Sequence, residues 1–173
     1  DAEALADRVS ALARLSLLGV DVGDRWLLLA KLWEPMMFDA RSPFNDLHAL
    51  LTFHYSNLGD LAQALVECVR SEYDRTIPMM RVGASVIEGV DALFQGDNDA
   101  ALASLQEHFS EVNLIGGSHA QRDLLSQITL EAAVRAGEWA SARAMLKERK
   151  LRRESMPYAY SRHCEQRMAV GST

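Results

Sequence analysis

Hydrophobic residues recur every three or four positions over most of this chain. This spacing places apolar side chains along one face of an α-helix, as Leu5, Val9 and Leu12 illustrate in the first segment. The sustained alternation of apolar and polar residues that indicates strands does not occur. The pattern therefore predicts an all-α fold with helices over residues 2–18, 25–34, 43–58, 61–72, 78–95, 98–109, 119–136, 139–150 and 158–169.

A short block of glycine, an acid, two further residues and then small residues separates neighbouring helices three times. It begins at Gly59-Asp60, Gly96-Asp97 and Gly137-Glu138. The glycine can end one helix in the left-handed region, and the acid can cap the next helix. Successive blocks are about 40 residues apart, close to the roughly 34-residue period of tetratricopeptide arrays.

These helix pairs predict one domain over residues 1–173, built as a right-handed α-α superhelix of tetratricopeptide-like hairpins. The hairpins are expected at about 2–34, 43–74, 77–110 and 118–151, followed by a capping helix at about 157–170 that starts at Pro157. Gly83 and Gly89 lie inside one predicted helix, where each costs about 1 kcal/mol relative to alanine. We therefore expect a neighbouring helix to pack closely there.

One polar stretch stands out from this pattern, at residues 114–123. Two glycines end the preceding segment, and Ser118 then stands where a helix N-cap is expected. Gln121 follows three positions later, so Ser118 and Gln121 form the sequence pattern of a capping box. The next helix should therefore begin at residue 119.

The first turns of that helix carry His119, Arg122 and Asp123, whose spacing puts them near one face. In one interpretation these side chains hydrogen-bond to neighbouring helices and fix their angle. In the other, Gly116, Gly117 and Ser118 form an anion cradle with Arg122 nearby, since free amides at a helix start suit a carboxylate or phosphate. The sequence leaves both open.

Three stretches together resemble the tetratricopeptide repeat protein 38 family, namely Leu17 to Trp26, Phe44 to Ala49 and Gly116 to Asp123. Members of that family are longer and carry further helical repeats on the N-terminal side. The resemblance thus implies an α-α superhelix and places this chain in the C-terminal half of a longer solenoid. It implies no established reaction.

The two polar blocks supply the candidate ligand-binding residues. Both are expected to open the first helix of a hairpin, and such helices line the concave side of a solenoid. Their side chains could then converge there, which is a hypothesis for the structure to test. The candidates are Asn45, Asp46, His48, Gly117, Ser118, His119, Gln121, Arg122 and Asp123.

Composition narrows the function classes. The 173 residues are 49% hydrophobic and 24% charged with a net charge of −6, which is typical of a globular domain and not of a nucleic-acid-binding protein. The basic run from Lys147 to Arg153 suits a solvated helix end. No apolar run is long enough for a membrane span. Cys68 and Cys164 have no motif spacing, so we expect free thiols and a cytoplasmic location.

The sequence gives little support for catalysis or for metal binding. The five histidines are scattered, and a metal would bind only if the fold joined His48 and His119 with Asp46 or Asp123. His119 and Asp123 have the spacing of an acid–base pair, but no nucleophile or cofactor motif accompanies them. We therefore expect no cofactor, no metal and no catalytic residue, and favour a non-enzymatic protein.

Two functions remain. The first is a helical-repeat interaction protein that binds a peptide or partner protein on its concave face. The alternative is a small-molecule protein or enzyme whose pocket, built by the two polar blocks, takes an anionic ligand. A closed cavity with His48, His119 and Arg122 converging would favour the alternative. If repeats are missing before residue 2, self-association through residues 2–34 is also expected.

Overall fold

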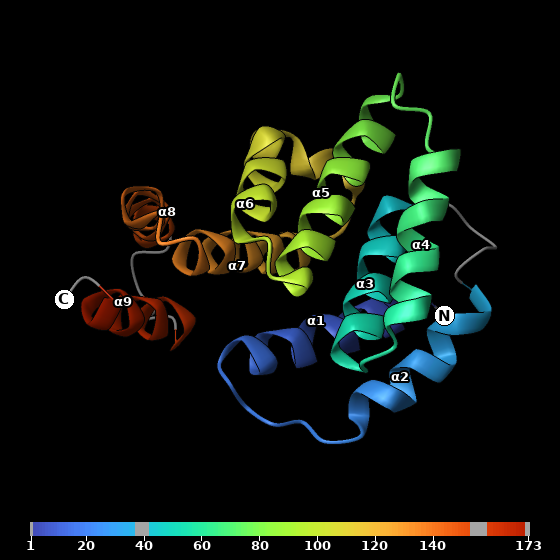
Figure 1. Ribbon diagram of the computed structural model, residues 1–173, viewed down its shortest axis with the longest axis horizontal. Coiled ribbons are helices and arrows are strands. Elements are labelled where there is room, and N and C mark those ends of the chain that lie inside the picture. Colours follow the sequence, from blue (N-terminus) through green and yellow to red (C-terminus); the bar gives the residue numbers. More distant parts are fainter. Residues whose placement is uncertain (1, 37–41, 153–158, 172–173) are drawn as a thin grey trace.

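The computed structural model describes residues 2–36, 42–152 and 159–171, and this part of the chain is helical without strands (Figure 1). The helices are α1 (Ala2–Leu17), α2 (Arg25–Trp33), α3 (Pro43–Tyr55), α4 (Gly59–Glu72), α5 (Pro78–Gln95), α6 (Asn98–Glu107), α7 (His119–Arg135), α8 (Trp139–Arg152) and α9 (Ala159–Gly171). Two short 3-10 helices, η1 (Glu34–Met36) and η2 (Phe109–Ile115), join them.

The all-α prediction is confirmed, and the observed helices begin and end within a few residues of the predicted ones. The 3-10 helix η2 was not predicted. It fills the connection between α6 and α7, packs on α5, and ends where Gly116 takes a positive φ of 93°. The predicted start of the last helix at Pro157 lies outside the described residues.

The predicted glycine terminators are correct at two of three positions. Gly96 and Gly137 have positive φ angles of 85° and 72°, and Asp97 accepts a hydrogen bond from the Ala100 amide at 3.1 Å as a cap. Between α3 and α4 the left-handed residue is instead Asn57, with φ of 57°, and Gly59 is the first residue of α4. Asparagine tolerates this conformation, so it replaces glycine there.

Three pairs of consecutive helices, α3–α4, α5–α6 and α7–α8, follow one another along the molecule (Figure 1). Helix α5 packs on α3 and α4, and α7 packs on α6, so the pairs are stacked in chain order. Helix α1 departs from this order because it packs on both α3 and α7. Helix α1 thereby joins two pairs that are far apart in the sequence.

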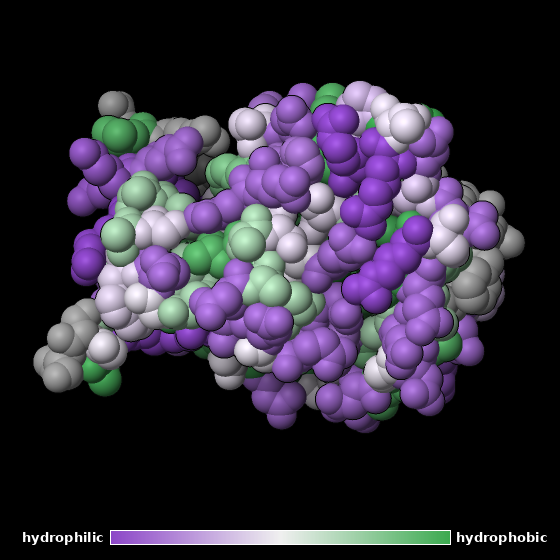
Figure 2. All heavy atoms as spheres, turned by 45° about the horizontal axis from the view of Figure 1, so that its top comes forward, coloured by the Kyte–Doolittle hydropathy of each residue, from purple (hydrophilic) through white to green (hydrophobic). Residues whose placement is uncertain are grey.

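Most large apolar side chains lie in one continuous core that includes residues from α1 to α9. On the face drawn in Figure 2, hydrophilic residues dominate over most of the molecule, and paler and green residues gather toward its left side. Trp33, Phe53 and Leu50 are among the largest side chains that are fully buried. Burial of this apolar surface is the main source of folding stability.

A buried carboxylate fastens the last helix to α7. Glu131 is 3% exposed and accepts hydrogen bonds from Tyr160 Oη at 2.6 Å and Arg167 Nη1 at 2.6 Å, both on α9. It also accepts from Arg135 Nε at 2.7 Å. Burial raises the pKa of Glu131, but the hydrogen bonds from Arg167, Tyr160 and Arg135 outweigh it and leave that pKa below its usual value.

The two glycines inside α5, Gly83 and Gly89, lie at close contacts with neighbouring helices, as predicted. A Cβ atom at Gly83 would lie 2.4 Å from Pro43 Cβ at the start of α3. A Cβ atom at Gly89 would lie 2.8 Å from Leu105 Cγ on α6. Both distances are too short for real carbon contacts, so the α5–α3 and α5–α6 spacings depend on these glycines.

Replacing Gly83 with alanine should therefore destabilise the fold. Alanine favours the helix by about 1 kcal/mol, but overpacking costs about 1–3 kcal/mol, and the rigid Pro43 ring has little room to move. We expect Gly83→Ala to lower the free energy of unfolding measured by urea denaturation. Gly59→Ala is the matched control because nothing lies within 4 Å of its added Cβ, and it should lose no stability. Equal stability of Gly83→Ala and wild type would contradict the close contact.

Candidate functional site

A pocket of about 580 Å³ opens between η2, the first turns of α7 and the end of α8. It includes three of the residues singled out in the sequence, all from the block that starts α7. Its lining residues are Phe109, Ser110, Val112, Asn113, His119, Arg122, Asp123, Ser126, Glu148 and Arg149.

The start of α7 has the predicted capping box. Ser118 Oγ accepts from the Gln121 amide at 3.2 Å, and Gln121 Oε1 accepts from the Ser118 amide at 2.7 Å. The Gln121 side chain also donates to Asp7 Oδ1 of α1 at 2.8 Å. Ser118 and Gln121 therefore cap the start of α7, Gln121 also ties it to α1, and neither residue lines the pocket.

Arg122 folds back over the two glycines that precede the helix. Its Nη1 donates to the carbonyl oxygen of Gly117 and lies 3.5 Å from that of Gly116, and its Nη2 lies 3.3 Å from His119 Nδ1. Gly117 has φ of +78°, a conformation that L side chains rarely adopt. The Arg122 guanidinium thus stabilises the turn at Gly116 and Gly117, and the turn in return orients the guanidinium. His119 lies beside them at the pocket wall.

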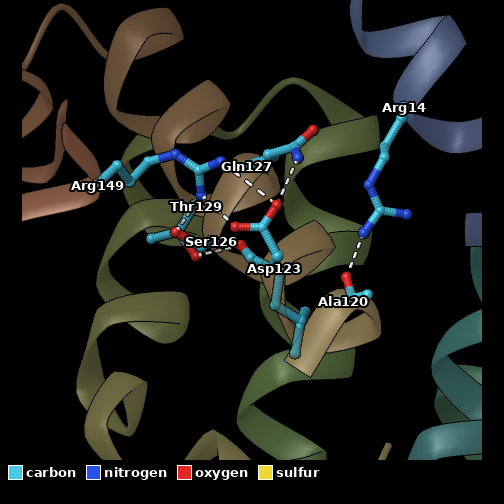
Figure 3. Close-up of polar contacts among 8 residues, drawn as sticks. Arg14, Ala120, Asp123, Ser126, Gln127, Thr129 and Arg149 are labelled. Carbon is cyan, nitrogen blue, oxygen red and sulfur yellow. Dashed lines mark hydrogen bonds and ion pairs between the residues drawn. The ribbon is translucent and has the colours of Figure 1, made fainter. Parts of the chain in front are cut away.

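Asp123 also lines the pocket, and it meets Arg149 of α8 (Figure 3). Arg149 Nη1 lies 2.9 Å from Asp123 Oδ1 and donates to Ser126 Oγ at 2.7 Å, and Gln127 Nε2 donates to Asp123 Oδ2 at 2.9 Å. The Arg149 and Asp123 side chains are only 8% and 15% exposed. This ion pair fixes α8 against α7. It agrees with the first interpretation of the sequence, in which these polar side chains bind neighbouring helices.

Sequence reasoning missed Arg149, because it treated the run from Lys147 to Arg153 as a solvated helix end. The periodicity of α8 contains the missing signal. Ala142 and Leu146 are buried, and Arg149 follows them at helical spacing on the same face. The walls formed by η2 were missed as well, since no pattern in residues 109–113 predicted a helix.

The second polar block, at the start of α3, lies away from the pocket. Asp46 is 6% exposed and accepts from Tyr73 Oη at 2.5 Å. His48 is 1% exposed, and Asn45 is half-buried. The pocket lining includes His119 and Arg122 but not His48, so His48 does not share this pocket with them.

His48 is held by two hydrogen bonds that fix its tautomer. Its Nδ1 lies 2.7 Å from the carbonyl oxygen of Phe44, which can only accept, so Nδ1 carries the proton. Its Nε2 lies 3.0 Å from Ser10 Oγ of α1 and therefore accepts from that hydroxyl. Burial lowers the pKa of His48 to about 4, and the Phe44 hydrogen bond opposes the shift only in part.

The two blocks do meet, but through other atoms than those expected. The Phe44 ring is packed so closely on Gly117 that an added Cβ would lie 2.5 Å from Cε2. Helix α1 contacts both blocks with one polar stripe, in which Asp7 meets Gln121, Ser10 meets His48, and Arg14 donates to the carbonyl oxygen of Ala120 (Figure 3). The two blocks therefore both contact α1, and only the block at the start of α7 also borders the pocket.

Within residues 2–36, 42–152 and 159–171, no three side chains of His, Cys, Asp or Glu gather as metal ligands. The proposed partners His119 and Asp123 contact Arg122 and Arg149 respectively. The arrangement is suited to binding and orienting a molecule.

No family model matches this chain, and no solved structure does. Every helix of the described segments is too short or too polar to cross a lipid bilayer.

The buried neutral His48 predicts a loss of stability in mild acid. Its folded pKa of about 4 lies below the usual 6.5, so the unfolded chain binds the proton more readily. Its contribution is full above pH 6.5 and falls as the pH drops toward 4, by up to about 3 kcal/mol at about 1.4 kcal/mol per pKa unit. Urea denaturation from about pH 7 to about pH 4.5 measures this loss.

The control for this prediction is His48→Gln, which should be less stable at neutral pH but should lose less stability over the same interval. Some slope will remain because burial also lowers the pKa of His54, despite its contact with Asp91. Identical slopes in wild type and His48→Gln would show that His48 is not the group responsible.

Proposed function

We propose that this chain is a tetratricopeptide-like helical-repeat protein that binds a small amphipathic anion in the pocket between η2, α7 and α8. The observation that carries the proposal is the pocket itself. Its volume of about 580 Å³ falls within the roughly 300–1,000 Å³ of small-molecule sites, and its walls include the polar block singled out in the sequence. Membership in the tetratricopeptide repeat protein 38 family remains part of this proposal.

The lining separates into regions of different chemistry. Arg122 and His119 stand at the N-terminal end of α7, where the helix dipole favours negative charge. A carboxylate or phosphate would bind at that end, and Arg122 is already oriented by the Gly116 and Gly117 carbonyls. Phe109 and Val112 of η2 offer an apolar wall for the rest of the molecule.

The position of α1 favours a small ligand as the binding partner. A peptide that ran along the first helices of the pairs would meet α1. Helix α1 packs on α3 and α7 and buries Leu5, Val9 and Ala13 there. A peptide that followed the α3–α7 side would have to displace this helix and its polar stripe. The pocket, by contrast, requires no rearrangement to receive a molecule.

Filling the pocket should abolish binding without removing a charged group. Asn113→Trp places a large ring in the pocket wall, and Leu114→Trp is the matched control because Leu114 is an exposed neighbour outside the lining. We would screen small carboxylates and phosphates with apolar bodies by saturation-transfer NMR and measure affinities by calorimetry. Hits should bind wild type and Leu114→Trp but not Asn113→Trp. An absence of hits, or hits that bind Asn113→Trp equally well, would overturn the proposal.

Self-association is a second candidate, favoured by the surface of α2. Leu27, Leu28 and Leu32 of this helix are 44%, 61% and 48% exposed, although α2 is only nine residues long. Exposed apolar faces at the end of a helical stack tend to associate. We propose that a second copy of this chain covers this leucine face.

The test is sedimentation velocity over a range of concentrations. Wild type should sediment as a dimer or larger species, whereas Leu28→Lys/Leu32→Lys should remain monomeric. The control is Ile77→Lys, which removes a similarly exposed apolar side chain outside α2 and should behave as wild type. A wild-type protein that is monomeric at every concentration would contradict self-association.

A further inference from the structure

Helices α8 and α9 leave a groove between them at the C-terminal end of the molecule. Both helices pack on α7, and the groove has a volume of about 560 Å³. The Trp139 ring at the start of α8 lies against Gly171 at the end of α9, where an added Cβ would come within 3.1 Å of the ring. The start of α8 therefore meets the end of α9 at this contact.

The floor of the groove is apolar. Leu146 of α8 and Met168 of α9 form it with only 9% and 6% of their surfaces exposed, and Ala169 adds an exposed methyl on the α9 side. A molecule that enters the groove thus reaches the edge of the hydrophobic core.

The α8 rim is cationic. Arg143, Lys147 and Lys150 are exposed and line the groove at helical spacing, so they follow one edge over about 10 Å, at 1.5 Å per residue. Among the lining residues that the structure describes, the single carboxylate is Glu165 on α9. This positive strip belongs to a chain with a net charge of −6, so the local charge opposes that of the whole molecule.

These three cations do not take part in the packing of α8 on α7. Arg149 is the basic residue that turns inward, where it pairs with Asp123 and Ser126. Arg143, Lys147 and Lys150 lie on the groove side and are exposed. Their charges are therefore available to a molecule that binds between α8 and α9.

We propose that this groove docks an acidic amphipathic helix of a partner protein. Apolar side chains of the partner helix would contact Leu146 and Met168, in the manner of helix-in-groove recognition. Its carboxylates would pair with Arg143, Lys147 and Lys150, and this charge complementarity selects an acidic partner.

The test uses two fluorescein-labelled helical peptides of about 15 residues, a length near the minimum for a stable isolated helix. Both carry the same leucine stripe, and their polar positions are glutamate in one and lysine in the other. Fluorescence anisotropy should show saturable binding of the glutamate peptide to wild type and none of the lysine peptide. Binding should weaken as salt concentration rises, since the ion pairs lie at an exposed rim.

Two variants probe the two walls of the groove. Lys147→Glu on α8 and Ala169→Glu on α9 should each weaken binding of the glutamate peptide at least about tenfold, because each places a like charge in its path. Lys31→Glu on α2 is the matched control, since it reverses an exposed lysine charge outside the groove, and it should bind as wild type. Circular dichroism checks that all three variants remain helical.

Three results would overturn the proposal. The glutamate peptide could fail to bind wild type, the lysine peptide could bind as well as the glutamate peptide, or Lys31→Glu could weaken binding as much as the groove variants. A single-stranded DNA oligonucleotide that competes for the groove with higher affinity would make it a nucleic-acid surface. A wild-type dimer that dissociates in Lys147→Glu would identify a second copy of this chain as the occupant.

Discussion

The contact of α1 with α3 and α7 is the interaction on which the rest of the structure depends. Helices α3 and α7 belong to different pairs, and α1 joins them with both an apolar face and a polar stripe. Within the stripe, Ser10 and His48 are buried and satisfy each other, which a buried hydroxyl and imidazole require. Removing either partner would leave the other without its hydrogen bond in the core.

This contact also positions the pocket. Arg14 and Asp7 of α1 bind the backbone and side chain of the first turn of α7, the same turn that carries His119 and Arg122. Phe44 packs on Gly117 from the other side. The turn before α7 is therefore held by α1, α3 and its own arginine, while Asp123 and Arg149 secure α8. A pocket with walls fixed in this way can bind a ligand without first ordering itself.

The two ends of the described helical stack differ in chemistry. Helix α2 exposes leucines, whereas the groove between α8 and α9 combines an apolar floor with a cationic rim. Apolar surface alone does not discriminate between partners, but a row of like charges disfavours any partner of the same sign. The C-terminal groove therefore has the means to be selective, and the leucine face is suited to a contact of large apolar area.

The sequence by itself determined the helices, the capping box at Ser118 and Gln121, and the close contacts at Gly83 and Gly89, because periodicity, capping and glycine are local signals. It also pointed to the residues from His119 to Asp123. Tertiary structure alone decided that α1 packs on both α3 and α7, that His48 is buried on Ser10 outside the pocket that His119 lines, and that Arg149 turns inward to complete the pocket. These outcomes depend on contacts between residues 26 to 114 positions apart, which no local pattern encodes. The same amphipathic helices could be packed in several ways, and only the matching of specific buried polar groups selects one.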